Sequence, residues 1–140
     1  MEDSKFQFKG FAIKKSLFER KDGDPSTKFD LDFSPKGFVN RKKSHFQLQL
    51  GVKITDENKI FIINIQAVAD FFFNSEIESK QLNSFFYVNA PAILFPYIRA
   101  YISALTTLSG LKPLTLPTLN LTNLGKELEK NTIDIKDTNE

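Results

Sequence analysis

Two carboxylates and one histidine are the residues of this chain whose types suit acid–base chemistry. Asp30 and Asp32 lie two residues apart in "KFDLDF", so both carboxylates share one face of an extended strand. Because apolar residues alternate with them, the wet side of an edge strand is the simpler interpretation. His45 is the single histidine and cysteine is absent, so there is no second histidine for a metal set and no thiol nucleophile. The pattern predicts a protein that is not an enzyme and has no cofactor or metal.

Phenylalanine is unusually frequent in this chain. The 140 residues include 15 Phe, no Trp and a single Met, whereas 41% hydrophobic and 26% charged residues are ordinary for a globular chain. Each aromatic side chain buries about 150–250 Å². Two interpretations stay open: a phenylalanine-rich core, or aromatic side chains that line a groove or an oligomer interface.

The charge balance disfavours nucleic acid as a partner. Nineteen basic and 17 acidic residues give a net charge of +2. "KGFAIKKS" at 9–16 lacks the further aromatics of an RNA-recognition strand, and "RKK" at 41–43 is interpreted as a solvated loop. The first residues contain no continuous apolar core of a signal peptide, so a cytoplasmic location is expected.

Alternation of apolar and polar residues predicts four strands in the first half of the chain. The strand segments are 5–18, 28–33, 45–55 and 60–69, with loops at 20–27 and 34–44. Gly10 shifts the phase of the first strand, which predicts a bulge there. Short connections favour an antiparallel sheet. The strand at 60–69 is apolar on both faces at its start and therefore needs cover on both.

The second half is predicted to be helical after an irregular crossover at 70–90. "AILFPYIRAYISAL" at 92–105 begins a long helix whose apolar stripe is expected to contain Leu94, Ile98, Tyr101, Leu105 and Leu108, with Gly110 as its cap. Two prolines and a central Arg99 exclude a membrane anchor. A short last helix at 123–131 is capped by Thr122, and 131–140 is a polar, mobile tail. The fold class is α+β: a four-stranded antiparallel sheet followed by a long helix and a short C-terminal helix.

The order of elements and one motif resemble the SecB family of protein-export chaperones. "ILFPYIR" at 93–99 matches the signature that opens the main helix of that family, and "PTLNL" at 117–121 follows at the expected distance. The motif residues are Ile93, Leu94, Phe95, Pro96, Tyr97 and Arg99. The resemblance covers roughly residues 5–130 and implies one SecB-like domain over 1–130.

The resemblance implies a homotetramer, a dimer of dimers, that holds unfolded polypeptides without ATP and passes exported precursors to the motor SecA. Family members bind clients in long apolar grooves, which by position would include Phe61, Ile63 and Ile65, with Phe33 from the second strand. We add Phe71, Phe85 and Phe86 from their place in the crossover. For each of these residues ordinary core packing is the alternative.

This chain departs from the family pattern at residues that help dock the motor SecA. Relatives carry acidic groups on strands one and four that help dock SecA; Glu19 keeps one such charge, whereas Lys15 and Asn64 stand where two others are expected. The sequence pI of about 8.8 points the same way. The alternatives are therefore a SecB-like chaperone of an antitoxin in a toxin–antitoxin system, or a non-chaperone binding module on the same scaffold.

Overall fold

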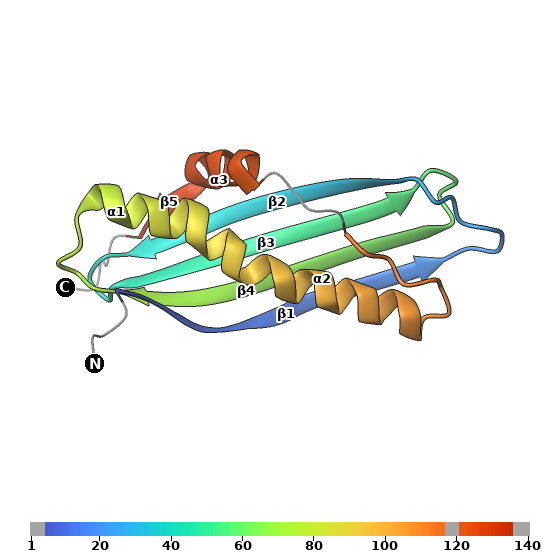
Figure 1. The fold of residues 1–140 in the computed structure, drawn as a ribbon, viewed down its shortest axis with the longest axis horizontal. Helices are drawn as coiled ribbons and strands as arrows, with labels where there is room; N and C mark the ends of the chain where they lie inside the picture. The colour runs from blue at the N-terminus through green and yellow to red at the C-terminus, as the bar shows by residue number, and fades with distance from the viewer. Residues whose placement is uncertain (1–4, 117–120, 136–140) are drawn as a thin grey trace.

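A sheet with helices on one face forms the molecule (Figure 1). The computed structural model describes residues 5–116 and 121–135. Its strands are β1 (Phe6–Arg20), β2 (Phe29–Asn40), β3 (His45–Asp56), β4 (Phe61–Phe73) and β5 (Thr132–Asp134), in the spatial order β1-β4-β3-β2-β5. The first four strands pair antiparallel, as predicted, and β5 adds a short parallel edge to β2. The predicted α+β class is confirmed, with a fifth strand that makes the sheet mixed.

The first strand contains the bulge predicted at Gly10. The register with β4 shifts between Phe8 and Gly10, and Gly10 adopts a φ of 118°, which L side chains rarely take. A second shift lies between Ile13 and Lys15. The two bulges explain why the alternation of this strand changes phase.

The second strand continues through residues 34–40, where the sequence predicted a loop. Pro35 misled that prediction, because proline cannot donate to a strand ladder. The amide of Gly37 donates to Asn131 rather than to β3, so odd-numbered residues of β2 direct their amides toward the sheet edge. The nitrogen of Pro35 therefore faces the sheet edge, so its missing N–H removes no hydrogen bond to β3. Its carbonyl accepts the Asn131 side-chain amide at 3.3 Å.

The predicted irregular crossover at 70–90 is instead mostly regular. β4 runs to Phe73, and α1 (Ser79–Ser84), a π-helical turn η1 (Phe85–Asn89) and α2 (Ala90–Leu108) follow without a break. Every fourth residue is buried along this helical run: Leu82, Phe86, Ala90, Leu94, Ile98, Ile102 and Thr106. That spacing is longer than the 3.6 residues of an α-helical turn, and the wider π turn helps keep the buried row on one side.

The end of α2 differs from the predicted apolar stripe. Ile102 and Thr106 are buried, whereas Leu108 is 87% exposed. Gly110 closes the helix as predicted, with a φ of 85°, and the next amide, that of Leu111, donates to the Thr106 carbonyl at 3.0 Å.

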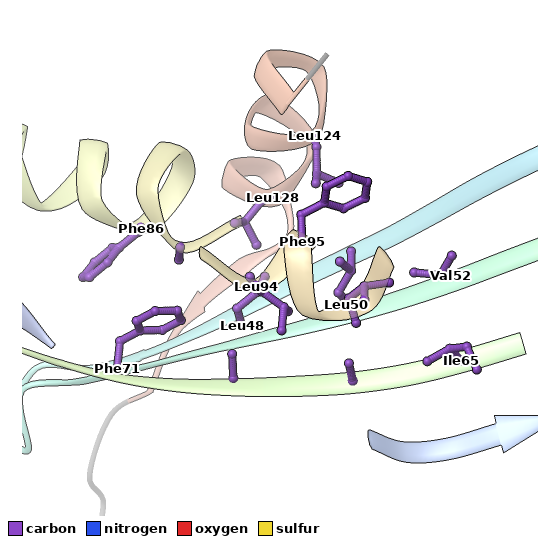
Figure 2. Packing of buried hydrophobic residues seen from close by; sticks show 14 of the residues in the cluster. Leu48, Leu50, Val52, Ile65, Phe71, Phe86, Leu94, Phe95, Leu124 and Leu128 are labelled. Carbon is purple, nitrogen blue, oxygen red and sulfur yellow. The ribbon is translucent and has the colours of Figure 1, made fainter. Parts of the chain in front are cut away.

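The core lies between α2 and the inner faces of β3 and β4. Figure 2 shows Phe86 and Leu94 directed from the helix toward the sheet, whereas the Phe95 ring lies on the side of α3. The buried sheet residues are Phe46, Leu48, Leu50, Val52 and Ile54 on β3, and Phe61, Ile63, Ile65, Ala67, Ala69, Phe71 and Phe73 on β4. Burial of apolar area at roughly 25 cal/mol per Å² makes this layer the main source of stability.

The last helix, α3 (Leu121–Lys130), contacts β2, η1 and α2. A Cβ on Gly125 would collide with the carbonyl oxygen of Tyr87, so this glycine permits the close approach of α3 to η1. Thr122 lies inside the helix, which corrects its predicted role as the cap. The following strand, β5, occupies the start of the segment predicted as a tail, so the sheet extends past residue 130. Residues 117–120, which include most of "PTLNL", and residues 136–140 lie outside the described residues.

A buried carboxylate joins the β3–β4 turn to the β1–β2 loop. Asp56 is 1% exposed and accepts backbone amides from Ile60 at 2.7 Å, Phe61 at 2.9 Å and Ser26 at 3.0 Å. Burial alone would raise the pKa of this carboxyl, but the backbone hydrogen bonds, led by that of Phe61, outweigh it and lower the pKa below its ordinary value.

Replacement of Asp56 by alanine is expected to reduce the free energy of unfolding by roughly 2–4 kcal/mol, because three amides lose their acceptor. A group with a lowered folded pKa stabilises fully above the ordinary aspartate pKa of about 4, and the stabilisation is lost as pH falls through the folded pKa. Urea denaturation of wild type and Asp56→Ala between pH 3 and 7 measures this. A difference in stability that stays constant from pH 7 down to pH 3 would contradict the account.

Candidate functional site

Most residues predicted to line a client groove lie in the closed core. Ile63, Ile65, Phe71 and Phe86 are fully or almost fully buried, and Phe61 is 5% exposed. They share this position because odd-numbered residues of β4 face the helices and β4 is an inner strand of the sheet. Their side chains therefore lie beneath α2, which covers them. An unfolded chain can reach them only beyond the ends of this helix.

One end of the cover is a cavity of about 540 Å³ beside Phe61. Phe29, Leu111 and Leu114 give its apolar surface, and all three are only half-buried. The charged residues on its rim are Arg20, Asp24 and Lys112. The cavity thus brings one predicted groove residue together with three apolar residues that sequence reasoning did not select. The alternation of "KFDLDF" already placed Phe29 on the same face as Phe33, and the leucines of "LKPLTL" were the second available signal.

Two buried polar groups hold the walls of this cavity. The Thr106 hydroxyl donates to the Ile102 carbonyl at 3.0 Å and accepts the amide of Leu114 at 2.9 Å. Asp56 holds Ser26, which also lines the cavity, and the amide of Phe61. The segment after α2 and the β1–β2 loop are therefore each fixed to the core by a hydrogen bond.

The other end of the cover is aromatic. Phe85 is half-buried and stacks on Phe6 with ring centroids 5.1 Å apart, and Phe6 stacks on Phe71 at 4.8 Å. Phe86 stacks on Phe46 at 4.3 Å below them. Phe33, the remaining predicted residue, is half-buried on β2 and meets the edge of Phe95 at 6.0 Å.

A shallower groove of about 400 Å³ runs between η1, the start of α2 and α3. Its apolar members include Tyr87, Val88 and Leu121, and Val88 is 59% exposed. Burial raises the pKa of the Tyr87 phenol, while a hydrogen bond with the Thr132 side chain opposes that shift.

The motif at 93–99 divides between two faces of α2. Leu94 and Phe95 are buried against the sheet, whereas Pro96 and Tyr97 are exposed and Ile93 is half-buried. Pro96 lies inside the helix and cannot donate to the Ala92 carbonyl, which lies on the exposed side. Arg99 is half-buried, and its Nε is a buried nitrogen without a hydrogen-bond partner among the described residues.

The sheet face without helices carries the residues predicted to meet a motor. Lys15, Glu19 and Asn64 all lie there, because their Cα partners across β1 and β4 are Gln66, Ile62 and Leu17. The structure therefore brings the three positions together on adjacent strands. Lys15 and Glu19 are exposed.

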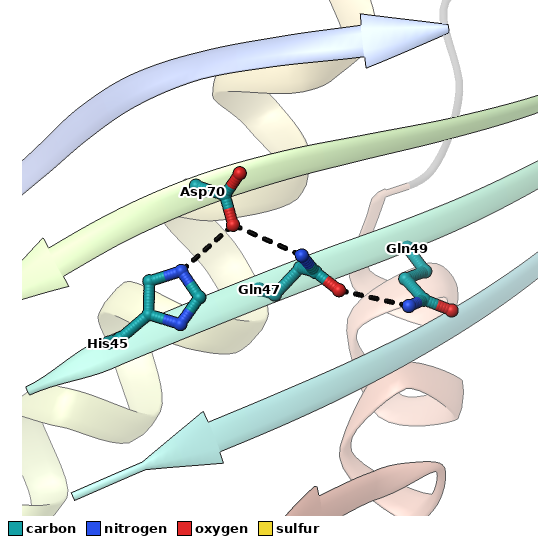
Figure 3. A network of polar contacts seen from close by, with 4 residues as sticks. All are labelled: His45, Gln47, Gln49 and Asp70. Carbon is teal, nitrogen blue, oxygen red and sulfur yellow. Dashed lines mark hydrogen bonds and ion pairs between the residues drawn. The ribbon is translucent and has the colours of Figure 1, made fainter. Parts of the chain in front are cut away.

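The residues considered for acid–base chemistry lie on the same helix-free face. The His45 Nε2 lies 2.8 Å from an Asp70 carboxylate oxygen, which also accepts the Gln47 amide at 3.2 Å, and Gln49 donates to Gln47 at 2.9 Å (Figure 3). Asp30 and Asp32 are exposed on this face of β2. The described residues contain no group of three or more side chains suited to hold a metal ion. Within the same residues no helix is long and apolar enough to cross a membrane.

Comparison with known proteins places the chain in a family. Residues 11–131 match the family model SecB, "Preprotein translocase subunit SecB". The chain is 32% identical over 99 residues to the protein-export protein SecB of Buchnera aphidicola subsp. Acyrthosiphon pisum, covering 69% of this chain and 67% of that protein. It is 24% identical over 106 residues to SecB of Magnetococcus marinus, covering 74% of this chain and 66% of that protein. The chain belongs to the SecB family.

The fold supports the same assignment. The Mycobacterium tuberculosis SecB-like chaperone Rv1957, solved in complex with a ChAD peptide from the Rv1956 HigA1 antitoxin, superposes with a TM-score of 0.70 at 20% identity. The match covers 83% of this chain and 88% of that chain. The chain spans about two thirds of the length of the curated relatives that it matches.

Proposed function

We propose that this protein is an ATP-independent holdase, which binds unfolded precursor polypeptides for export in apolar grooves of a cytoplasmic homotetramer. The family assignment over residues 11–131 supports the proposal. The observation that carries it is the apolar cavity beside Phe61, because that residue lies on the strand that the resemblance assigns to the groove.

The cavity suits the side chains that only an unfolded chain exposes. Its surface of Phe29, Leu111 and Leu114 is apolar, while the rim is charged and wet. A client side chain that enters is removed from water, which contributes about 1.5–3 kcal/mol for a large apolar residue. Folded proteins keep such side chains inside and offer little to the cavity. Among the predicted groove residues, Phe61, Phe33 and Phe85 are the ones that remain reachable at the margins of α2, and Ile63, Ile65, Phe71 and Phe86 support them from below.

The outward face of α2 supports the tetramer. The exposed positions of this helix are all uncharged: Ala92, Pro96, Tyr97, Ala100, Ala104, Thr107 and Leu108. A solvent-facing helix usually carries charged side chains, whereas an uncharged face with small residues suits close contact with another helix. A second copy of this chain is the natural cover for a face of this kind, and a dimer of dimers joins this contact to one further interface.

A second candidate function is a SecB-like chaperone of an antitoxin. The likeness to the Rv1957 fold favours it, and so does the charge of the helix-free sheet face. Glu19 is the acidic residue there that matches the family pattern, while Lys15 and Asn64 lack the negative charge expected for docking SecA.

Replacement of Leu111 by glutamine is expected to weaken binding of reduced, carboxymethylated α-lactalbumin about tenfold, since the cavity loses apolar surface. Fluorescence anisotropy of the labelled client measures the affinity. Ile135→Gln removes an exposed apolar side chain far along the chain from the cavity and should bind as wild type does. Equal affinity of Leu111→Gln and wild type would remove the cavity from the client site.

Replacement of Ala100 by glutamate on the exposed face of α2 is expected to split the tetramer into smaller species, because the charge would be buried between copies. Light scattering after size-exclusion chromatography measures the mass. Gln81→Glu, which adds the same charge at an exposed position of α1, is the control and should leave the tetramer intact. A wild-type monomer, or an unchanged tetramer in Ala100→Glu, would refute this interface.

Binding of SecA distinguishes the export role from the antitoxin role. We expect weak binding by wild type at low salt, and at least tenfold tighter binding by the double variant Lys15→Asp, Asn64→Glu, which restores two negative charges beside Glu19. Calorimetric titration measures both. Tight wild-type binding that Glu19→Gln does not weaken would show that a motor docks elsewhere.

A further inference from the structure

The first residues of β1 form a short cover over the aromatic end of the core. We call residues 5–9 the N-terminal strap. They pair with the last residues of β4, with Phe6 opposite Phe73 and Phe8 opposite Phe71, and the Asn74 amide donates to the Lys5 carbonyl at 3.0 Å. Gly10 and its bulge separate the strap from the rest of β1. The strap and residues 10–20 therefore pair with β4 as two segments in different register.

Phe6 and Phe8 fill the place of an external ligand. The Phe6 ring lies between those of Phe71 and Phe85, at 4.8 and 5.1 Å with interplanar angles of 7° and 8°. The Phe8 ring contacts Phe71 at 5.4 Å and the exposed Tyr97 at 5.7 Å. Phe71 is fully buried beneath them, whereas the two strap rings are only half-buried. Removal of the strap would expose an aromatic cleft and the free edge of β4 together.

The sequence of the strap shows which chemistry this cleft accepts. In "KFQFK" two aromatic side chains at i and i+2 point inward, and polar residues alternate with them. On the opposite face the Lys9 ammonium lies 5.9 Å from the Phe72 ring. The backbone pairs require no particular side chain, and the two ring positions select aromatic residues.

We propose that the N-terminal strap is a displaceable internal ligand, which occupies a client site until an extended client segment with aromatic residues at i and i+2 replaces it on β4. This inference rests on the proposed holdase function and adds regulation to it. The strap keeps Phe71 and Phe85 covered in the free protein, so the cleft opens only in exchange for an equivalent segment. Binding then orders the client segment and releases the strap, which gains conformational entropy. Because the strap competes for the same site, the apparent affinity for client is lower and release is easier.

An engineered disulfide tests the proposal in a single protein. The chain has no cysteine, so Gln7→Cys with Phe72→Cys introduces the only thiols, at directly opposed positions on the helix-free face. Oxidation fixes the strap on β4 without touching the inner aromatic rings. We expect carboxymethylated α-lactalbumin to bind the reduced form at least tenfold more tightly than the oxidised form. The control is Leu17→Cys with Asn64→Cys, an opposed pair beyond the bulge, for which oxidation should change nothing.

The outcomes separate this inference from the holdase proposal. Equal client affinity of the oxidised and reduced strap variant would overturn the inference and leave the holdase standing. No client binding in either state, with none by wild type, would overturn both. A peptide of the sequence "SKFQFKG" should bind the reduced form and not the oxidised form, and its version with both phenylalanines replaced by alanine should bind neither. Hydrogen exchange adds a direct readout: amides of residues 6–8 should exchange faster when client is bound.

Discussion

The packing of α2 against the inner face of β3 and β4 is the interaction on which the rest of the structure depends. Ile63 and Ile65 are completely buried beneath α2, and a row of buried side chains from Ala90 to Thr106 holds the helix on the sheet. The helical run crosses the sheet obliquely (Figure 1). Apolar side chains that stay half-buried, such as Phe29, Phe33 and Phe85, lie at the margins of this cover. Phe61 with its cavity lies at one end, and Phe71 and Phe85 lie beneath the strap at the other. The closed core therefore decides where binding surfaces can be.

The two faces of α2 have different tasks although both are apolar. The side chains of the buried face pack against the sheet. The exposed face, with Ala100 and Ala104, carries no charged residue. One helix therefore contributes both to the core of the subunit and to the proposed contact between subunits. A substitution that moves a residue between these faces would change both properties together.

The opposite face of the sheet is built from hydrogen-bonded polar side chains. The Asp70 carboxylate lies within hydrogen-bond distance of the His45 ring and accepts from Gln47 there, and Lys15, Asn64 and Glu19 share the same face of β1 and β4. Lys15 and Glu19 are exposed on this face, so charges of both signs reach the solvent there. The cavity beside Phe61 and the helix-free positions Lys15 and Asn64 therefore lie on opposite faces of the sheet.

The sequence by itself determined the four main strands, the Gly10 bulge, the Gly110 cap and the family, because alternation, backbone strain and the "ILFPYIR" motif are local signals. It did not reveal that β2 continues through Pro35, since proline is harmless only when its nitrogen faces the sheet edge. Nor did it show that Leu108 is exposed while Thr106 is buried, or that "DFFFNSEIESKQLNSFFYVNA" enters a helix through a π turn. For the candidate site, the sequence selected a group of aromatic and aliphatic residues, and only tertiary packing decided which of them lie beneath α2 and which lie at its margins. The physical reason is that the burial of each side chain depends on which part of the sheet α2 and the strap cover. The local sequence does not indicate where that coverage ends.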